Sequence, residues 1–423
     1  MSHFHQCLSI ERLGRRGEAI AQGANGPIFV PYALPGERVL AEIDGAHGTL
    51  IEVVEPSPAR IDPPCAYFTQ CGGCALQMLD ASSYAGWKRD LVITALRHAG
   101  LAAEVGELVD AHGEGRRRTT FHARYPQGRT ELGYMRMHSH AMIEIDSCKV
   151  LAPAMVKALS AARAFAETLA PSRKPLDILV TATQSGLDID LRGHGALTER
   201  QMRDLARIAE TEDLARLSNH GTSVIIRRPP MLVMGKARLV PPPGAFLQAT
   251  EEGEARLVAG LLAEVKGAGS IADLFAGVGT FALRLAEFAQ VAAFDLDERA
   301  LRALEKAAHA PGFRPVRVAR RDLFASPLSV LELDPFEAVV FDPPRAGALA
   351  QARTLAASQV PIVIAVSCNP ESFARDAAIL CAGGYELASV MPIDQFRYTP
   401  HVEILASFRR KTKTTRRNRR LLG

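Results

Sequence analysis

The chain has 423 residues, of which 48% are hydrophobic and 23% are charged, and its formal net charge is +4. This length and composition are typical of a soluble globular protein with two or three domains and a substantial core. No apolar run of about eighteen residues and no charged-then-apolar leader is present, which argues against a membrane span and a signal peptide. We therefore expect a cytoplasmic protein.

Residues 1–56 alternate short apolar runs with glycine turns. This pattern predicts a small antiparallel β-barrel, with strands at 28–30 and 38–43 among others. A proline-rich stretch at 56–64 then predicts a stiff connector.

Four cysteines form an unusual arrangement in the next region. Cys65, Cys71 and Cys74 lie within ten residues, and Cys148 follows about seventy residues later. A disulfide framework is not expected in a cytoplasmic chain, whereas four thiolates can hold a zinc ion or an iron–sulfur cluster. The Gly-Gly pair at 72–73 would let the chain fold tightly and direct backbone N–H groups at the sulfurs. The spacing alone leaves zinc and iron–sulfur equally open.

Residues 57–239 mix helical and strand patterns and predict an α+β central domain. We expect helices at 87–98 and 153–169, and strands at 176–183 and 187–191.

Positive side chains gather at 116–118 and in a tail at 411–423 that carries no acidic residue. Local patches of this kind suit a phosphate backbone, although each run alone is equally typical of a solvated surface.

Helical and strand patterns alternate regularly from 240 to 410, and the expected strands are almost wholly apolar. This predicts an α/β domain in which helices cover both faces of a parallel sheet. The expected helices are 251–265, 281–288, 298–309 and 350–358, and the expected strands are 271–274, 291–295, 316–319, 338–341 and 362–366.

Carboxylates at the ends of the first three of these strands predict a nucleotide-type cofactor site, because ligands of such sheets bind at the carboxyl ends of the strands. Asp273 ends the first strand and is followed by a loop that contains Phe275 and Gly277. Asp295 is suited to accept hydrogen bonds from ribose hydroxyls, and Asp322 to reach an adenine amino group. The loop has neither the dinucleotide spacing nor a Walker lysine, which disfavours NAD and ATP and favours S-adenosylmethionine.

Two further motifs follow the next strand ends. They are Asp-Pro-Pro-Arg at 342–345 and Ser-Cys-Asn-Pro at 367–370. Together they place the thiol of Cys368 beside a pocket of the size of a base.

With these motifs assembled, the chain resembles the bacterial RNA (uracil-5-)methyltransferases, and most closely the branch that modifies 23S ribosomal RNA. The resemblance covers nearly the whole chain. Segment 29–37 resembles the best-marked stretch of a TRAM domain, an RNA-binding variant of the oligonucleotide-binding fold. The resemblance also implies that the four cysteines hold a 4Fe-4S cluster, which we expect to be structural.

The resemblance assigns three further residues in the carboxyl half. It implies that Gln248, in the Phe-x-Gln segment, contacts S-adenosylmethionine and that Asp342 belongs to the same site. It also implies that Glu403, in the motif at 399–403, is the family's catalytic base. One departure precedes this motif, because Phe-Arg-Tyr-Thr at 396–399 replaces the usual Phe-Pro-His-Thr.

The chemistry of uracil gives these residues their expected roles. C5 is a weak nucleophile until a thiolate adds to C6, so Cys368 is expected to form that adduct. Glu403 would then remove the C5 proton, Asp342 would hold the uracil edge, and Arg345 would offset negative charge on the ring carbonyl.

The base must leave its stack to reach such a pocket, so the expected partner is a single-stranded or flipped nucleotide of RNA bound by a monomeric enzyme. Ribosomal RNA ranks before the T-loop uridine of tRNA, because tRNA enzymes of this family commonly lack the barrel and the cysteines. An RNA-binding module without activity and a redox or folate-dependent enzyme are the remaining alternatives. The motif residues disfavour the module, and the absence of a flavin fingerprint disfavours the redox enzyme.

Overall fold

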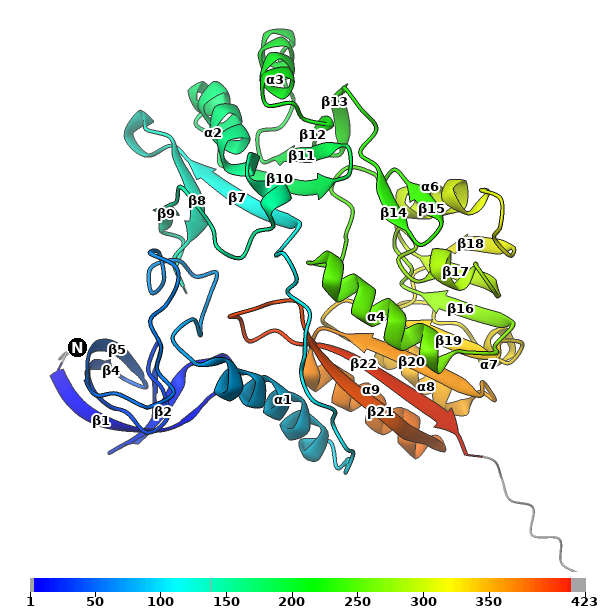
Figure 1. Cartoon of the computed structure of the whole chain (residues 1–423), viewed down its shortest axis with the longest axis horizontal. Coiled ribbons are helices and arrows are strands. Elements are labelled where there is room, and N and C mark those ends of the chain that lie inside the picture. The colour runs from blue at the N-terminus through cyan, green and yellow to red at the C-terminus, as the bar shows by residue number, and fades with distance from the viewer. Residues whose placement is uncertain (1–3, 138, 412–423) are drawn as a thin grey trace, which may run out of the picture.

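A computed structural model of the protein describes residues 4–137 and 139–411 (Figure 1). Within these residues it contains a closed barrel, a seven-stranded sheet, a two-stranded sheet and an eight-stranded sheet. Apart from Lys411, the predicted basic tail lies outside the described residues. No helix of the described segments is long and apolar enough to cross a bilayer.

The expected amino-terminal barrel is confirmed. Its strands follow the order β1-β2-β3-β5-β4 around the closed sheet. They are β1 (Phe4–Leu13), β2 (Ala19–Gly23), β3 (Gly26–Val30), β4 (Arg38–Asp44) and β5 (His47–Glu55). Alternate side chains such as Leu8, Ile10 and Val39 fill the interior, as period-two patterning requires. The buried carboxylate of Glu37 pairs with Arg60 and so ties the barrel to the connector.

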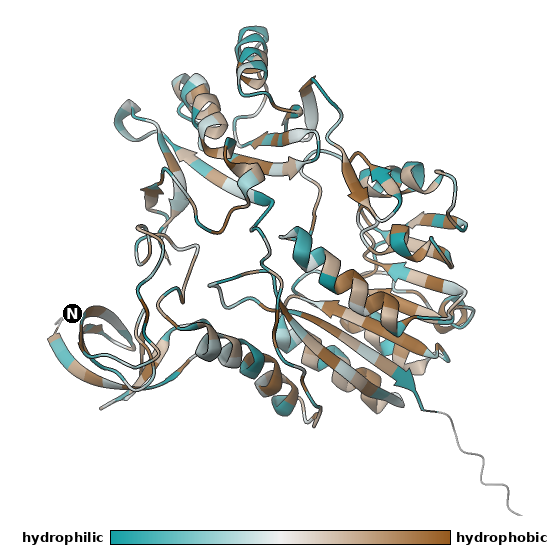
Figure 2. Ribbon diagram, in the orientation of Figure 1, coloured by the Kyte–Doolittle hydropathy of each residue, from teal (hydrophilic) through white to brown (hydrophobic). Residues whose placement is uncertain are grey.

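The seven-stranded sheet forms the centre of the chain and has the order β13-β12-β11-β10-β7-β8-β9. Its strands are β7 (Arg118–Arg124), β8 (Glu131–Met135), β9 (Met142–Glu144), β10 (Leu176–Thr183), β11 (Gly186–Arg192), β12 (Arg216–Asn219) and β13 (Thr222–Ile226). Helices α2 (Ala158–Leu169) and α3 (Glu199–Thr211) pack on it through an apolar core that includes Phe121 and Phe165. Figure 2 shows that the rest of α3 is largely hydrophilic.

The eight-stranded sheet has the order β18-β17-β16-β19-β20-β22-β21-β6. Its strands are β6 (Val109–Asp110), β16 (Ser270–Leu274), β17 (Gln290–Asp295), β18 (Val316–Arg320), β19 (Ala338–Phe341), β20 (Ile362–Ser367), β21 (Tyr385–Asp394) and β22 (Glu403–Arg410). Its helices are α4 (Glu251–Glu264), α5 (Ala282–Leu285), α6 (Glu298–Ala308), α7 (Val330–Leu333), α8 (Leu349–Ala357) and α9 (Pro370–Ala382). Two separate apolar clusters cover its two faces, which confirms the doubly wound α/β fold.

Two segments predicted to belong to the central domain at 57–239 instead pack with the eight-stranded sheet. Helix α1 (Ala81–His98) buries Val92 and Leu96 in the same cluster as β20 and α9, and β6 pairs with β21. The hairpin of β14 (Leu232–Met234) and β15 (Ala237–Leu239) packs against the other face. Hydrophobic burial, and not chain order, decides where these segments lie.

Candidate active site

Strands β16 and β19 are parallel neighbours, and the order in which successive strands join the sheet reverses between them, which is where ligands of doubly wound sheets bind. Asp273 is the next-to-last residue of β16, Asp342 follows β19 and Cys368 follows β20. Strand β22 runs antiparallel to β20, with Ser367 paired to Ile404. The next position of that register sets Cys368 opposite Glu403, so the thiol and the carboxyl reach the same edge.

Two buried glutamines connect the carboxyls of Asp342 and Glu403. Gln248 Nε2 donates to Asp342 Oδ2 at 3.1 Å. Gln395 Nε2 donates to Gln248 Oε1 at 2.7 Å and to Glu403 Oε2 at 2.8 Å. Gln395 Oε1 in turn accepts from the Ala249 N–H at 2.9 Å. This chain of amides connects the two acids through buried hydrogen bonds and so fixes their separation.

Gln395 was not predicted from the sequence. It lies in the loop that follows β21, eight residues before Glu403, and is fully buried. No motif marks it, because only the β21–β22 hairpin brings it beside the Phe-x-Gln segment.

Burial raises the pKa of both Asp342 and Glu403. It raises the pKa of Asp342 to about 7, against the opposing effect of the Gln248 hydrogen bond. Burial, followed by the nearby Asp342 carboxyl, raises the pKa of Glu403 to about 8, and the Gln395 hydrogen bond acts in the opposite direction. A carboxyl with a pKa near the working pH is suited to accept and release a proton.

Cys368 occupies the turn between β20 and α9. Asn369 caps the helix by accepting from the Glu371 N–H at 3.0 Å, and Pro370 starts it. The positive end of the helix favours a thiolate at this position. Burial nevertheless raises the pKa of Cys368 to about 11, and the acids Glu403 and Asp342 add to this, whereas Arg345 lowers it.

Arg345, in the motif that follows β19, extends toward the loop before β22. Its Nη2 lies 2.6 Å from His401 Nε2. Burial lowers the pKa of His401 to about 4, so the ring is neutral and can accept a hydrogen bond from the guanidinium.

The expected cofactor carboxylates lie at the neighbouring strand ends. Asp273 is fully buried, and neither of its carboxyl oxygens has a hydrogen-bond partner among the described residues. Burial raises its pKa well above the ordinary value and the nearby Asp342 carboxyl adds to this, whereas the neighbouring Ala282 N–H, which lies outside hydrogen-bond geometry, acts in the opposite direction. Asp295 Oδ2 accepts from the Gly277 N–H at 2.8 Å, which draws the glycine loop toward the second strand. Asp322 Oδ1 accepts from two backbone N–H groups of its own turn, at 3.0 and 3.1 Å.

Apolar side chains flank these acids. Phe275 has a positive φ of 61°, and its ring centroid lies 5.4 Å from that of Phe324. Phe324 and Leu296 are 49% and 53% exposed, although large apolar side chains are usually covered. Leu296 directly follows Asp295, and Phe324 lies two residues after Asp322. Their positions beside two predicted cofactor acids could have identified them from the sequence.

The four cysteines line one pocket between the 65–74 loop and the seven-stranded sheet. All four are free thiols, and burial raises the pKa of Cys71 and Cys148 and that of Cys74 to about 11. As expected from the glycine pair, the Gly73 N–H points at Cys71 Sγ, at 3.4 Å. At position 72 an added Cβ would lie 2.9 Å from a backbone nitrogen, so only glycine fits.

All four thiols are partly buried where they line this pocket. Within residues 4–137 and 139–411, no three His, Cys, Asp or Glu side chains are placed to share one metal ion.

In the basic run at 116–118, Arg117 is buried and Arg116 and Arg118 are partly buried. Arg117 is buried, pairs with Glu254 and donates to the Gln248 carbonyl at 3.1 Å. Arg118 donates to the Leu247 carbonyl at 2.9 Å, and Arg116 lines the cysteine pocket. Arg117 and Arg118 thus hold the backbone of the Phe-x-Gln segment, because a buried guanidinium must be paired.

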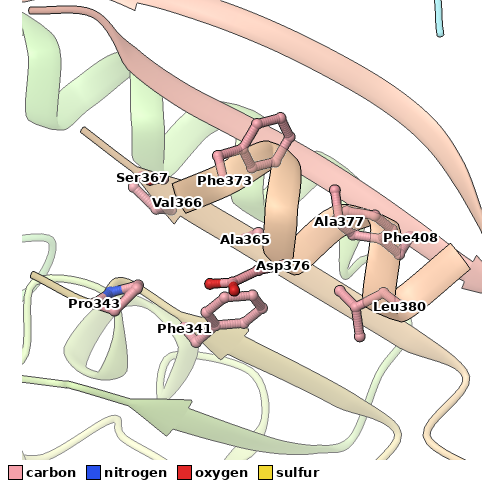
Figure 3. Close-up of a pocket in the computed structure, with 10 residues that line it drawn as sticks. All are labelled: Phe341, Pro343, Ala365, Val366, Ser367, Phe373, Asp376, Ala377, Leu380 and Phe408. Atoms are coloured by element: carbon pink, nitrogen blue, oxygen red, sulfur yellow. The ribbon is translucent and has the colours of Figure 1, made fainter. Parts of the chain in front are cut away.

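A second cavity lies between β19, β20 and α9 (Figure 3). It is lined mainly by apolar side chains, including Phe341, Val366 and Phe373. Its one carboxyl, Asp376, already accepts from the Ala348 N–H and pairs with Arg375. This cavity therefore offers no free polar group to a substrate.

The chain is similar to known proteins along nearly its whole length. The profile of the tRNA (uracil-5-)-methyltransferase family matches residues 244–411. The chain is 44% identical to an uncharacterized RNA methyltransferase of Brucella suis, over 94% of this chain and 96% of that protein. It is 33% identical to the 23S rRNA (uracil(1939)-C(5))-methyltransferase of Chromohalobacter salexigens, over 96% and 89% of the two chains. The crystal structure of the Pyrococcus abyssi tRNA (uracil-54, C5)-methyltransferase, in complex with S-adenosyl-L-homocysteine, shares the fold with a TM-score of 0.74. It is 22% identical, over 95% of this chain and 99% of that one.

Proposed function

The chain belongs to the RNA (uracil-5-)-methyltransferase family, and from this premise we propose that it methylates C5 of a uridine in 23S ribosomal RNA through a covalent adduct of Cys368. The observation that carries the proposal is the facing arrangement of Cys368 and Glu403 on β20 and β22, with Asp342 linked to Glu403 through two amides. A thiol that can attack C6 and a carboxyl that can remove the C5 proton are the two groups that this chemistry requires, and both lie at the same edge of the sheet.

Ribosomal RNA is proposed as the target for two reasons. The similarity to the Chromohalobacter enzyme extends through the barrel and the cysteine region, not only the carboxyl half. The barrel, which we propose to be an RNA-binding module at 1–56, docks beside the cysteine loop. The T-loop uridine of tRNA is the second candidate; the archaeal tRNA enzyme shares the fold at 22% identity, and that alone does not select a target.

S-adenosylmethionine would supply the methyl group as a sulfonium cation. The partnerless, buried carboxyl of Asp273 suits an ammonium or amide donor of this ligand, because such a group is otherwise costly to bury. Asp295 and Asp322 would accept from ribose and adenine, between the exposed apolar surfaces of Leu296 and Phe324. Gln248 would orient the methyl-bearing end of S-adenosylmethionine, because its side-chain amide already donates a hydrogen bond to Asp342.

The first step assigned to this chain is attack by the Cys368 thiolate on C6 of the flipped uracil. A C–S bond forms, the C5–C6 double bond opens, and C5 becomes nucleophilic toward the methyl group. Arg345 lies near Cys368, and its positive charge favours the Cys368 thiolate. The same charge would offset negative charge that develops on the uracil ring. Asp342, protonated below a pKa of about 7, could donate to a uracil carbonyl as well as accept from the ring N–H.

The second step is removal of the C5 proton by Glu403. The electrons of the C5–H bond restore the C5–C6 double bond, the C–S bond breaks, and Cys368 leaves as a thiolate. Because burial raises the pKa of Glu403 to about 8, the acid form that results from this transfer is stable at neutral pH. Glu403 must be ionised before each turnover, so the rate of this step is expected to rise with pH.

We also propose that Cys65, Cys71, Cys74 and Cys148 hold a 4Fe-4S cluster. The pocket that they line and the N–H directed at Cys71 Sγ support this assignment. The role is structural, since no step above transfers an electron.

The target is tested by mapping 5-methyluridine in 23S rRNA and tRNA from cells with and without the gene. The proposal expects one 23S rRNA position to lose its methyl group while position 54 of tRNA keeps it. Loss from tRNA alone would instead establish the second candidate, and no change in either RNA would contradict the proposed activity.

A further inference from the structure

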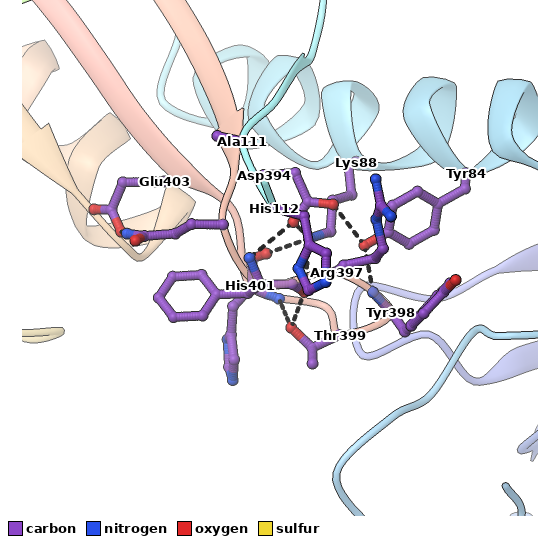
Figure 4. A network of polar contacts seen from close by, with 12 residues as sticks. Tyr84, Lys88, Ala111, His112, Asp394, Arg397, Tyr398, Thr399, His401 and Glu403 are labelled. Atoms are coloured by element: carbon purple, nitrogen blue, oxygen red, sulfur yellow. Dashed lines mark hydrogen bonds and ion pairs between the residues drawn. The ribbon is translucent and has the colours of Figure 1, made fainter. Parts of the chain in front are cut away.

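Helix α1 reaches the loop at residues 395–402, which joins β21 to β22 and ends immediately before Glu403 (Figure 4). The side chain of Lys88 on this helix is fully buried, which is rare for lysine unless the ammonium is paired. The helix itself is fixed, because Val92 and Leu96 pack in the apolar cluster below the sheet.

All three donors of the Lys88 ammonium are directed at the ends of the loop. Lys88 Nζ forms an ion pair with Asp394, the residue before the loop. It also donates to the His401 carbonyl at 2.6 Å and to the Phe396 carbonyl at 3.2 Å. An ammonium has three N–H groups and no acceptor, so these contacts use its whole capacity. One side chain thereby connects both ends of the loop.

Tyr84 lies one helical turn before Lys88, on the same face of α1. Its hydroxyl donates to Asp394 Oδ2 at 2.9 Å and accepts from the Tyr398 N–H at 2.8 Å. Tyr398 has a positive φ of 67°, a conformation that non-glycine residues keep only where surrounding contacts hold it. Its carbonyl accepts from the N–H groups of residues 75 and 76, directly after the cysteine loop.

We propose that Lys88 and Tyr84 are positioning residues for Glu403, an inference that rests on the proposed role of Glu403 as the base. Neither side chain contacts the thiol or the acids of the site. Both act on the backbone of the loop, whose first residue, Gln395, holds the Glu403 carboxyl and whose last residue, Val402, precedes it. Cys368 is held by β20 and α9, and neither Lys88 nor Tyr84 forms a hydrogen bond or ion pair with it.

Because Lys88 and Tyr84 contact the loop before Glu403 and not Cys368, loss of their contacts should slow the step that uses Glu403. Attack by Cys368 and methyl transfer should proceed, whereas removal of the C5 proton should slow because the carboxyl is no longer held over C5. Misplacement of a catalytic group by about 1 Å can cost about a hundredfold in rate. The covalent RNA adduct should therefore persist longer in the variants than in the wild type.

The test compares the full-length Lys88→Met and Tyr84→Phe variants with Arg89→Met. Arg89 is on the same helix and also donates to carbonyls, at 2.7 to 3.1 Å, but those belong to residues 105 and 106 outside the loop. Each protein is mixed in excess with a 23S rRNA fragment and S-adenosylmethionine carrying a labelled methyl group. Label in RNA measures methyl transfer, and the band that resists denaturation measures the adduct.

We expect the label to enter RNA at close to the wild-type rate in all three variants. The adduct should last about tenfold longer or more in Lys88→Met, somewhat longer in Tyr84→Phe and no longer in Arg89→Met, in line with the cost of misplacement. Tyr84→Phe removes only a hydroxyl, so it decides the matter if Lys88→Met does not fold. A variant that melts earlier but resolves its adduct at the wild-type rate would overturn the proposal.

Glu403→Gln, measured in parallel, separates this inference from the proposed function. If Glu403→Gln accumulates the adduct while Lys88→Met and Tyr84→Phe do not, the base stands and the positioning role falls. If Glu403→Gln resolves normally, both fall. The double variant Lys88→Met with Glu403→Gln should match Glu403→Gln alone, since Lys88 acts only through the base; an additive effect would contradict that.

Discussion

Replacing Gln395 by leucine tests how the site sets the protonation of its base. Leucine fills similar space but removes the N–H donor to Glu403 Oε2, the donor to Gln248 Oε1 and the acceptor for the Ala249 N–H. Each lost contact leaves a buried polar group without a partner, which costs about 1–3 kcal/mol of stability.

The effect on Glu403 has a definite sign and size. A hydrogen bond to a charged group contributes about 1.5–3 kcal/mol, and one pKa unit corresponds to about 1.36 kcal/mol. The Gln395 bond lowers a pKa that burial has raised to about 8, so its loss should raise that pKa by about one to two units more. Glu403 acts as a base only when ionised. The rise of the rate with pH should therefore move to higher pH by the same one to two units, roughly.

The assay is decay of the RNA adduct in single turnover, measured between about pH 6 and pH 10. Gln351→Leu is the matched control, because Gln351 is equally buried and makes three hydrogen bonds to Leu328 and Thr354, away from the site. It should lower stability and leave the pH profile unchanged. If Gln395→Leu also leaves the profile unchanged, Gln395 does not control the base.

The remaining predictions concern the nucleophile, the cofactor, the cysteine pocket and stability. Cys368→Ala should abolish methylation but keep S-adenosylmethionine affinity in calorimetry, because the thiol acts only on the uracil. Residual turnover well above background would contradict the covalent route. Asp273→Asn should weaken cofactor binding by about 1.5–3 kcal/mol while stabilising the ligand-free protein, since it removes a partnerless buried carboxyl; unchanged affinity would exclude Asp273 from the cofactor site. Cys71→Ser should lose bound iron and sulfide, and wild-type protein that, purified without oxygen, holds zinc and no iron would refute the cluster. Burial raises the pKa of Glu403 to about 8, so its contribution to stability is complete below its ordinary pKa and is lost as pH rises through about 8. Urea denaturation of the ligand-free protein should show stability falling over that range, and less so in Glu403→Gln; equal slopes would contradict the raised pKa.

The sequence predicted those parts of the fold that local patterns determine. Apolar runs between glycines marked the barrel and the parallel strands, since a fully buried strand must be apolar throughout. Asp273, Asp295, Asp342 and Cys368 could be assigned to one edge, because every parallel strand of such a sheet ends there.

The parts that could not be predicted depend on contacts between distant segments. Gln395 and Lys88 carry no local signal, and their roles arise only when the β21–β22 hairpin meets residue 248 and helix α1. The run at 116–118 has the composition of an RNA-binding patch, yet Arg117 finds Glu254, 137 residues away, and is buried with it. Composition gives the charge of a segment but not the partner that neutralises it.

The proposed mechanism requires that Cys368 form a covalent bond to the target uracil and that Glu403 release it. The most direct measurement is denaturing electrophoresis of Glu403→Gln after reaction with a 23S rRNA fragment and S-adenosylmethionine carrying a labelled methyl group. We expect a stable protein–RNA band that carries the label and disappears when Cys368→Ala is added to the same variant. A Glu403→Gln protein that forms no such band, or one that forms it equally well without Cys368, would contradict the account.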